Sequence, residues 1–184
     1  MEENSEIPKI RVVSGQRNFQ YVLHIGSNVG DREEYLRAAR EMLLNKFGGP
    51  QEFSPVYETQ PWGVKEQGFF LNQAVVGRTE LHPYKFLRCC KSIEYDLGRS
   101  KAKNWGPREI DIDIIFFHSC IIGTSDLTIP HPYLKERKFV LKPLIDLIPN
   151  FVDPISEHTV YQIYEQCEDP LAVELFKQTS DVGN

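Results

Sequence analysis

The feature that most constrains the fold of this chain is a glycine-proline turn followed at once by an apolar run that carries two aspartates. The whole stretch reads Trp105-Gly106-Pro107-Arg108-Glu109-Ile110-Asp111-Ile112-Asp113-Ile114-Ile115-Phe116-Phe117. Side chains two residues apart in a strand point to the same face, so Asp111 and Asp113 share one face, and the isoleucines beside them share the other. The stretch therefore predicts a sheet strand with an apolar side and a carboxylate side.

The paired carboxylates indicate a site for a cation. Two like charges side by side on an apolar strand are costly unless a positive group neutralises them. Mg²⁺ is the natural candidate, because it takes oxygen ligands and is usually held by one or two carboxylates together with substrate phosphates. Arg108 on the turn, and the basic run from Arg99 to Lys103, supply the positive charge that a polyphosphate needs. We therefore expect a metal–nucleotide site at the edge of a sheet.

Composition sets the class of protein. The chain has 184 residues, 41% of them hydrophobic and 26% charged, which is typical of one soluble globular domain. A formal net charge of −5 argues against a general nucleic-acid binder. The acidic N-terminus lacks the apolar segment of a secretory signal, and no run approaches the roughly 20 apolar residues of a membrane helix. We expect a soluble, cytoplasmic protein that works without nucleic acid or membrane.

Hydrophobic periodicity predicts alternating strands and helices over residues 20–118. The expected order is a strand at 21–26, a helix from Asp31 to Phe47, strands at 52–58 and 69–76, a helix opened by Pro83 at 83–97, and then the aspartate strand. Pro55 pushes the strand at 52–58 toward an edge or a bulge. The order βαββαβ fits an α+β fold of ferredoxin-like type, with a mostly antiparallel sheet, flanking helices and C-terminal additions.

The C-terminal additions are predicted to be short elements. They are strands at 120–122 and 127–129, a short helix at 134–138, a helix at 139–148 that Pro143 breaks or kinks, and a helix capped by Thr159 and ending at Glu168. We expect a single domain over residues 19–168. A flexible N-terminal tail at 1–18 and a C-terminal tail at 169–184 would flank it.

Three smaller features each allow a functional and a plainer reading. The glycine-rich turn at 26–30 lacks the Lys-Ser/Thr of a phosphate loop, so we interpret it as structural. Phe70 and Asn72 share a strand face and could hold a flat heterocycle, or could be a core ring and an amide bonded to backbone. His131 could bind phosphate or metal, although a lone histidine is more often structural.

Several motifs in order give the chain a family resemblance. They are Ile25-Gly26-Ser27-Asn28, Tyr57-Glu58-Thr59-Gln60-Pro61-Trp62-Gly63, Gln67-Gly68-Phe69-Phe70-Leu71-Asn72, Ile93-Glu94 with Gly98-Arg99, the aspartate stretch, and Pro130-His131-Pro132 with Arg137 and Phe139-Val140-Leu141. Over roughly residues 20–168 the chain resembles the 6-hydroxymethyl-7,8-dihydropterin pyrophosphokinase family of folate biosynthesis. Separate motifs in family order are far more specific than any one of them.

The resemblance implies a reaction and its partners. ATP, as co-substrate, would donate its β,γ-pyrophosphoryl group to the hydroxymethyl oxygen of 6-hydroxymethyl-7,8-dihydropterin, leaving AMP. Two Mg²⁺ ions would serve as cofactors, as in the family. The partners would be these two small molecules alone, and we expect the chain to act as a monomer.

The resemblance also implies roles for individual residues. Asp111 and Asp113 match the metal ligands, and with Arg99 and Arg108 they form the expected catalytic group. The positions matched to ATP binding are Glu94, Arg99, Lys101, Trp105, Arg108, Ile114, His131 and Arg137. The positions matched to pterin binding are Thr59, Gln60, Pro61, Trp62, Phe70, Asn72 and Phe139. Lys101 stands where the family often has arginine, so its phosphate contact would be that of a point charge.

Two other functions fit the same aspartate pair. One is a Mg²⁺-dependent phosphohydrolase or nucleotidyl transferase, and the other is a ferredoxin-like regulatory module that binds its ligand without turnover. Product analysis separates the enzymes, because pyrophosphoryl transfer yields AMP, γ-phosphoryl transfer yields ADP, and hydrolysis needs no pterin. A binding module has no need for Asp111, Asp113, Arg99 and Arg108 together.

Overall fold

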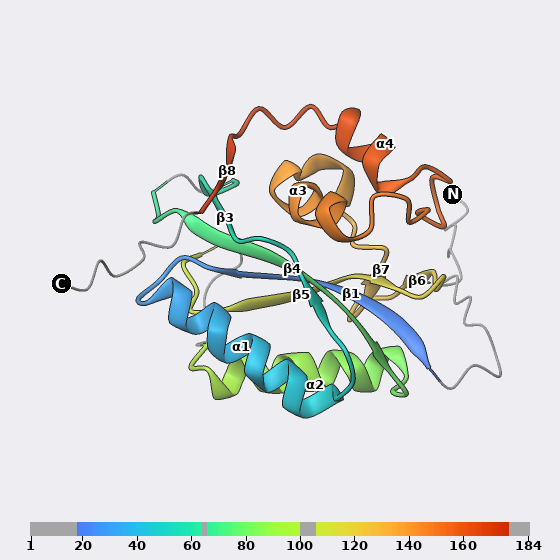
Figure 1. Cartoon of the computed structure of the whole chain (residues 1–184), viewed down its shortest axis with the longest axis horizontal. Helices are drawn as coiled ribbons and strands as arrows, with labels where there is room; N and C mark the ends of the chain where they lie inside the picture. The colour runs from blue at the N-terminus through green and yellow to red at the C-terminus, as the bar shows by residue number, and fades with distance from the viewer. Residues whose placement is uncertain (1–17, 64–65, 100–105, 177–184) are drawn as a thin grey trace, which may run out of the picture.

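The computed structural model describes residues 18–63, 66–99 and 106–176, and its framework is an antiparallel sheet covered by helices on both faces (Figure 1). The strands of this sheet are β1 (Phe19–Ser27), β2 (Glu52–Phe53), β3 (Tyr57–Thr59), β4 (Phe70–Thr79), β5 (Asp111–Phe117) and β8 (Val173–Leu175). Their order in space is β5-β1-β4-β3-β8, and β2 also pairs with β4. Every pairing is antiparallel, which confirms the predicted ferredoxin-like α+β fold.

The helices lie in two layers. The first layer holds α1 (Arg32–Phe47) and α2 (Pro83–Asp96), and the opposite layer holds α3 (Lys138–Leu147) and α4 (Val160–Glu165), as Figure 1 shows. A 3₁₀ turn, η1 (Leu134–Glu136), leads into α3, and a two-stranded hairpin joins β6 (Ile122–Gly123) to β7 (Thr128–Ile129). Among the residues that the structure describes, no helix has the length and apolar character needed to cross a membrane.

Local sequence explains the first two helices. The Asp31 side chain accepts a hydrogen bond from the backbone N–H of Glu34 at 3.0 Å and so caps α1, which ends before Gly48 at a φ of 64°. Pro83 occupies the first turn of α2, where the missing N–H costs nothing. Both helices begin and end close to their predicted positions, and each buries its periodic apolar side chains against the sheet.

The sheet separates two hydrophobic cores, and β5 contributes to both. Ile112 and Ile114 pack in the core under α1 and α2, as predicted for the apolar side of the aspartate strand. A register shift against β1 then places one extra residue in β5. Consequently Ile115 and Phe116 both enter the second core, which is covered by α3 and α4. The strand is thus buried on both faces near its end and opens to a cavity only at Asp111 and Asp113.

The predicted strand over 52–58 is divided in two by Pro55. Pro55 has no N–H to donate to a neighbouring strand, so regular pairing stops after β2 and resumes at β3. Ser54 covers the gap: its N–H donates to the carbonyl of Ala74 at 3.1 Å, and its hydroxyl accepts from the Ala74 N–H at 2.9 Å.

The C-terminal third departs from prediction at three points. Helix α3 continues through Pro143, because proline removes one hydrogen bond without removing the packing of the apolar face. Helix α4 has the predicted Thr159 cap but ends at Glu165, three residues before the expected Glu168. Residues 173–175, expected in a tail, form β8 on the outer edge of β3, where Phe176 also packs against the first core.

Candidate active site

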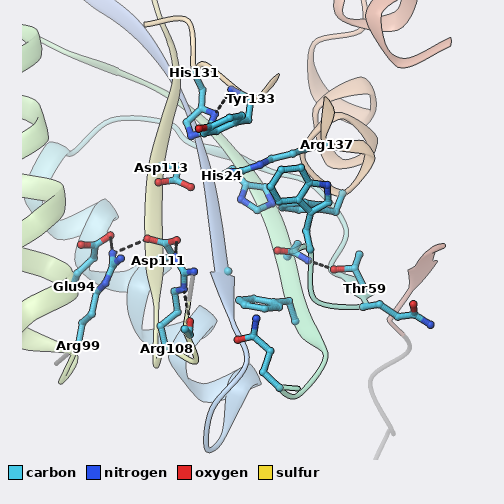
Figure 2. A pocket seen from close by; sticks show the side chains of 18 of the residues that line it. His24, Thr59, Glu94, Arg99, Arg108, Asp111, Asp113, His131, Tyr133 and Arg137 are labelled. Atoms are coloured by element: carbon cyan, nitrogen blue, oxygen red, sulfur yellow. Dashed lines mark hydrogen bonds and ion pairs between the residues drawn. The ribbon is translucent and has the colours of Figure 1, made fainter. Parts of the chain in front are cut away.

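A cavity of about 710 Å³ lies on the α3 side of the sheet, over the ends of β5, β1 and β4 (Figure 2). Most of the predicted site residues line it, namely Thr59, Gln60, Trp62, Phe70, Asn72, Glu94, Arg99, Arg108, Asp111, Asp113, His131, Arg137 and Phe139. Figure 2 shows Glu94, Arg99, Arg108 and Asp111 gathered on one side and Thr59 and Arg137 on the other. The cavity therefore joins a charged wall to an aromatic and amide wall.

The charged wall is built on the edge strand β5. Asp111 lies opposite Gly26 and Asp113 opposite His24 in the register with β1, so both carboxylates face the cavity from one strand. Burial and the neighbouring Asp111 raise the pKa of Asp113 to about 7. Burial also acts to raise the pKa of Asp111, but Arg108 and Arg99 outweigh it and hold that pKa below its ordinary value. The pair thus combines an ion-paired Asp111 with an Asp113 that forms no ion pair with any residue the structure describes.

An ion network holds the arginines against Asp111. The Arg99 guanidinium lies 2.6 Å from Asp111 Oδ1, and Arg108 forms an ion pair with the other carboxylate oxygen. Arg99 also pairs with Glu94, a residue near the end of α2 that is only 3% exposed. Glu94 Oε1 accepts the backbone N–H of Ile112 at 2.7 Å, so it ties α2 to β5. Lys91 completes the network at 2.9 Å from Glu94.

The turn that carries Arg108 is held by the glycine-rich loop after β1. Asn28 Oδ1 accepts the backbone N–H of Arg108 at 2.8 Å, and the Asn28 N–H donates to the Arg108 carbonyl at 3.2 Å. The Asn28 amide also donates to Gln67 Oε1 at 3.1 Å and to the Gly68 carbonyl at 3.3 Å. These contacts fit the structural interpretation of this loop, which connects the two loops that border the cavity.

The opposite wall is aromatic with a buried amide. Asn72 Nδ2 donates to Thr59 Oγ1 at 2.7 Å, and Asn72 is 1% exposed, so its amide is fixed at the base of the wall. Gly26 leaves room beside it, because a Cβ there would come within 2.9 Å of Asn72 Oδ1. The Phe70 ring and the Arg108 guanidinium lie 5.9 Å apart across the boundary between the two walls. A flat ring with polar edges suits such a surface.

Arg137 borders the cavity in an aromatic setting. Its guanidinium carbon is 4.8 Å from the ring centroids of both Trp62 and Tyr133 and 5.8 Å from that of Phe139.

His131 lies beside Arg137 and is uncharged. Burial lowers the pKa of His131 to about 4, with Arg137 as the second cause, so His131 is neutral near pH 7. The ring of His131 accepts the Tyr133 N–H at 3.3 Å.

Some predicted positions lie elsewhere. The Ile114 side chain packs in the first core, on the face of β5 opposite Asp113, and does not line the cavity. Pro61 is buried beside the cavity without lining it. Lys101 and Trp105 fall outside the described residues. The position of the Ile114 side chain follows from strand alternation, which places it on the face of Ile112 and not on the face of the aspartates.

Sequence reasoning missed several residues of the cavity wall. They are His24, Gly26, Gln67, Lys91, Tyr95, Gly106 and Tyr133. His24 had a usable signal, because alternation places it on the same face as Gly26 of the glycine-rich turn. Lys91 lies one helical turn before Glu94, which also places it on the cavity side of α2. Nothing in the local sequence distinguishes Tyr133 from an ordinary loop tyrosine.

The chain is similar in sequence to known proteins. A sequence model of the 7,8-dihydro-6-hydroxymethylpterin-pyrophosphokinase (HPPK) family matches residues 22–149. A 2-amino-4-hydroxy-6-hydroxymethyldihydropteridine pyrophosphokinase of Aquifex aeolicus is 43% identical over 133 residues, covering 72% of this chain and 82% of that protein. The protein of the same name from Bacillus subtilis is 43% identical over 131 residues, covering 71% and 78%.

Longer proteins are similar over one part of their length. The folic acid synthesis protein fol1 of Schizosaccharomyces pombe is 40% identical over 146 residues, which are 78% of this chain but 20% of that protein. A solved wild-type HPPK-DHPS of Plasmodium falciparum superposes with a TM-score of 0.66 at 19% identity, covering 88% of this chain and 43% of that one. This likeness supports the fold, and the chain spans less than half of that structure.

Proposed function

Because this chain belongs to the HPPK family and catalyses pyrophosphate transfer from ATP to the hydroxymethyl dihydropterin of folate synthesis, we propose that its two cavity walls hold the two substrates. ATP would lie along the charged wall and the pterin along the aromatic and amide wall. The observation that carries this proposal is that Asp111, Asp113, Arg99 and Arg108 face Phe70, Asn72 and Phe139 across a single cavity. The chemistry would take place where the walls meet.

Asp111 and Asp113 fit Mg²⁺ held partly by a substrate. Among the described residues there is no group of three or more His, Cys, Asp or Glu side chains that could hold a metal alone. Two carboxylates completed by phosphate oxygens and water are the usual protein share of a Mg²⁺ site. The raised pKa of Asp113 is a further sign that this carboxylate needs a cation. Two Mg²⁺ ions bound there would neutralise the phosphates and orient the pterin hydroxyl toward them.

Arg99 and Arg108 would change partners when the nucleotide binds. Without it both guanidinium groups neutralise Asp111. A cation bound at Asp111 would neutralise that carboxylate in place of the arginines. Both guanidinium groups would then be free to bind phosphate oxygens, which they can contact in a bidentate way. Glu94 would keep Arg99 in place through this change. The hydroxymethyl oxygen would attack the β-phosphorus and give up its proton to one of the two aspartates or to water. The bond between the β-phosphorus and the oxygen shared with the α-phosphate would break, and AMP would leave with that oxygen.

The pterin would lie flat between the rings of Phe70 and Phe139. Asn72, fixed by Thr59, would hydrogen-bond the edge of the pterin, and the loop through Gln60, Pro61 and Trp62 would close the pocket around it. Stacking orients the hydroxymethyl group toward Asp113. Positioning of this kind accounts for much of phosphoryl-type catalysis, since the protein does little covalent chemistry itself.

The remaining assignments concern ATP and the state of the protein. We assign Lys101, Trp105, His131 and Arg137 to contacts with ATP, and Ile114 through its backbone alone, because its side chain lies in the core. We also propose that the chain acts as a cytoplasmic monomer on small molecules, without nucleic acid or membrane. One chain supplies residues for both substrates, so the proposed site does not require a second copy.

An assay of AMP formation tests the proposed roles of the two cavity walls. The protein, ATP, Mg²⁺ and 6-hydroxymethyl-7,8-dihydropterin are combined, and adenine nucleotides are separated. We expect AMP in amounts equal to the pterin pyrophosphate, and a loss of about a thousandfold in Asp113→Asn, which removes one metal ligand. Asp126→Asn, at an exposed position outside the cavity, is the matched control. Near-normal Mg²⁺-dependent activity of Asp113→Asn would contradict the metal assignment.

A further inference from the structure

The buried histidine His24 lines the cavity but takes no part in the proposed transfer. His24 on β1 is 5% exposed and lies opposite Asp113 on one side and Ala74 on the other, between the charged wall and the second core. Its ring meets the Phe139 ring edge-on, with centroids 5.7 Å apart and an interplanar angle of 62°. Figure 2 shows His24 between Asp113 and the Arg137 side of the cavity. His24 therefore connects the sheet to the first turn of α3.

Helix α3 has an unusual gap at the same place. Pro143 lies inside the helix and has no N–H, so the carbonyl four residues earlier, that of Phe139, lacks its ordinary helical donor. A buried carbonyl without a donor costs free energy, so such groups are nearly always paired with a side chain or water. The Phe139 carbonyl therefore lacks its usual donor in the helix, and the His24 ring of β1 lies against the ring of the same residue.

The pKa of His24 agrees with a hydrogen bond from its ring to the Phe139 carbonyl. Burial lowers the pKa of His24 to about 3, and the nearby Phe139 backbone acts in the opposite direction. A bond to a carbonyl favours the N–H form and raises the pKa of histidine, whereas a bond from the Phe139 N–H would lower it. Among the residues that the structure describes, the buried Nε2 has no hydrogen-bond partner, so we assign the donor role to Nδ1.

We propose that His24 is a positioning residue for the pterin, because its Nδ1–H donates to the Phe139 carbonyl that Pro143 leaves free. The bond fixes the first turn of α3 against β1 and so holds the Phe139 ring at the right distance from Phe70 across the cavity. His24 acts through Phe139 and need not touch the substrate. This inference rests on the proposed stacking of the pterin between the two rings.

Substitutions at His24 separate the two ring nitrogens. Asn places its amide nitrogen close to the position of Nδ1, whereas Gln places it close to Nε2, and Phe removes both while keeping a ring. We expect His24→Phe and His24→Gln to weaken pterin binding about tenfold and His24→Asn to retain most of it. The affinity for ATP, measured on the same proteins, should change less than threefold. Equal losses for Asn and Gln would overturn the assignment of Nδ1.

A double-mutant cycle with Pro143 gives the decisive test. Pro143→Ala restores an N–H that can donate to the Phe139 carbonyl, so the bond from His24 becomes redundant. We expect His24→Phe to weaken pterin binding about tenfold in the wild type but less than threefold in the Pro143→Ala background. Urea unfolding of all four proteins identifies any variant that fails to fold, and the same coupling should appear there in the denaturation midpoint. Losses that are equal in both backgrounds would overturn the proposal.

The cycle also distinguishes this inference from the proposed function. If coupling appears in urea unfolding while pterin affinity is unchanged in every variant, the hydrogen bond exists but the stacking role of Phe139 fails. If AMP formation is normal and no coupling appears in either measurement, the function stands and the His24 inference fails.

Discussion

The side-chain oxygen of Asn28 accepts the backbone N–H of Arg108 at 2.8 Å across 80 residues of sequence. Asn28 thereby holds the arginine turn against the loop at Gln67 and Gly68. The glycine-rich segment after β1 thus contributes to the site by shaping its border.

Removal of Asn28 should disturb both folding and activity. Asn28→Ala leaves the Arg108 N–H without its acceptor, and we expect a loss of about 1–3 kcal/mol in the free energy of unfolding and about tenfold or more in kcat/KM for ATP. Asn28→Asp keeps the acceptor for Arg108 but not the two donations to the 67–68 loop. It should therefore retain more activity than Asn28→Ala. Urea denaturation and steady-state kinetics check both, and equal activity of the two variants would argue against the Arg108 contact as the important one.

Two substitutions at Glu94 separate its structural role from its electrostatic role. Glu94→Gln keeps an oxygen for the Ile112 N–H but removes the charge that holds Arg99. We expect a higher KM for ATP with a nearly unchanged denaturation midpoint. Glu94→Ala also leaves the buried Ile112 N–H unpaired and should lower the free energy of unfolding by about 1–3 kcal/mol. If Glu94→Gln and Glu94→Ala lower the free energy of unfolding equally, the hydrogen bond to Ile112 does not contribute to stability by itself.

Acid should destabilise the ligand-free protein through His24. Its pKa is about 3 in the folded state, mainly because of burial, and about 6.5 when unfolded. Since the folded pKa is the lower one, the stabilisation is fully present above pH 6.5 and is lost as pH falls toward 3. At pH 5 the contribution of His24 to the free energy of unfolding should be about 2 kcal/mol smaller than at pH 8, whereas Asp113, whose folded pKa is raised to about 7, acts in the opposite direction. The His24 contribution is therefore measured as the difference between the wild type and His24→Asn at each pH. His24→Asn should show a shallower pH dependence in urea unfolding, and an unchanged slope would contradict the buried neutral imidazole.

The C-terminal strand should stabilise the fold without serving the chemistry. Phe176 packs against the first core next to β8, far along the sheet from Asp113. Phe176→Ala should cost about 1–3 kcal/mol of unfolding free energy while leaving kcat within about twofold. Thermal melts and the AMP assay test this. A large fall in kcat with a normal melting temperature would instead connect this edge to the site.

Alternation and local chemistry were sufficient to predict the elements on which the site is built. Asp111 and Asp113 share a face because strands have a period of two, and Asp31 and Pro83 mark helix starts by their own bonding properties. Long-range pairing was harder to predict. Strand β8 is only three residues long, Val173–Leu175, so its sequence carries too little pattern to predict a strand, and it forms by pairing with the free edge of β3. Pro143 lies within α3 because tertiary packing outweighs its local preference.

The site was predicted best where residue type alone limits the chemistry. Carboxylates and arginines near a turn indicate phosphate and metal, and the family resemblance supplied the pterin side. His24 and Tyr133 were missed because their roles depend on neighbours brought in by the fold, namely Phe139 and Arg137. Ile114 was assigned to ATP by resemblance, whereas the alternation of β5 places its side chain in the core.

Counting the metal ions in a nucleotide complex tests whether Asp111 and Asp113 hold Mg²⁺. The ATP analogue used carries a methylene group in place of the oxygen between the α-phosphate and β-phosphate, so transfer cannot occur. Mn²⁺ replaces Mg²⁺ so that bound metal can be counted by electron paramagnetic resonance. We expect two Mn²⁺ per complex in the wild type and in Asp126→Asn, and at least one site weakened tenfold or more in Asp113→Asn. Two equally tight sites in Asp113→Asn would contradict the assignment of Asp111 and Asp113 as the metal clamp.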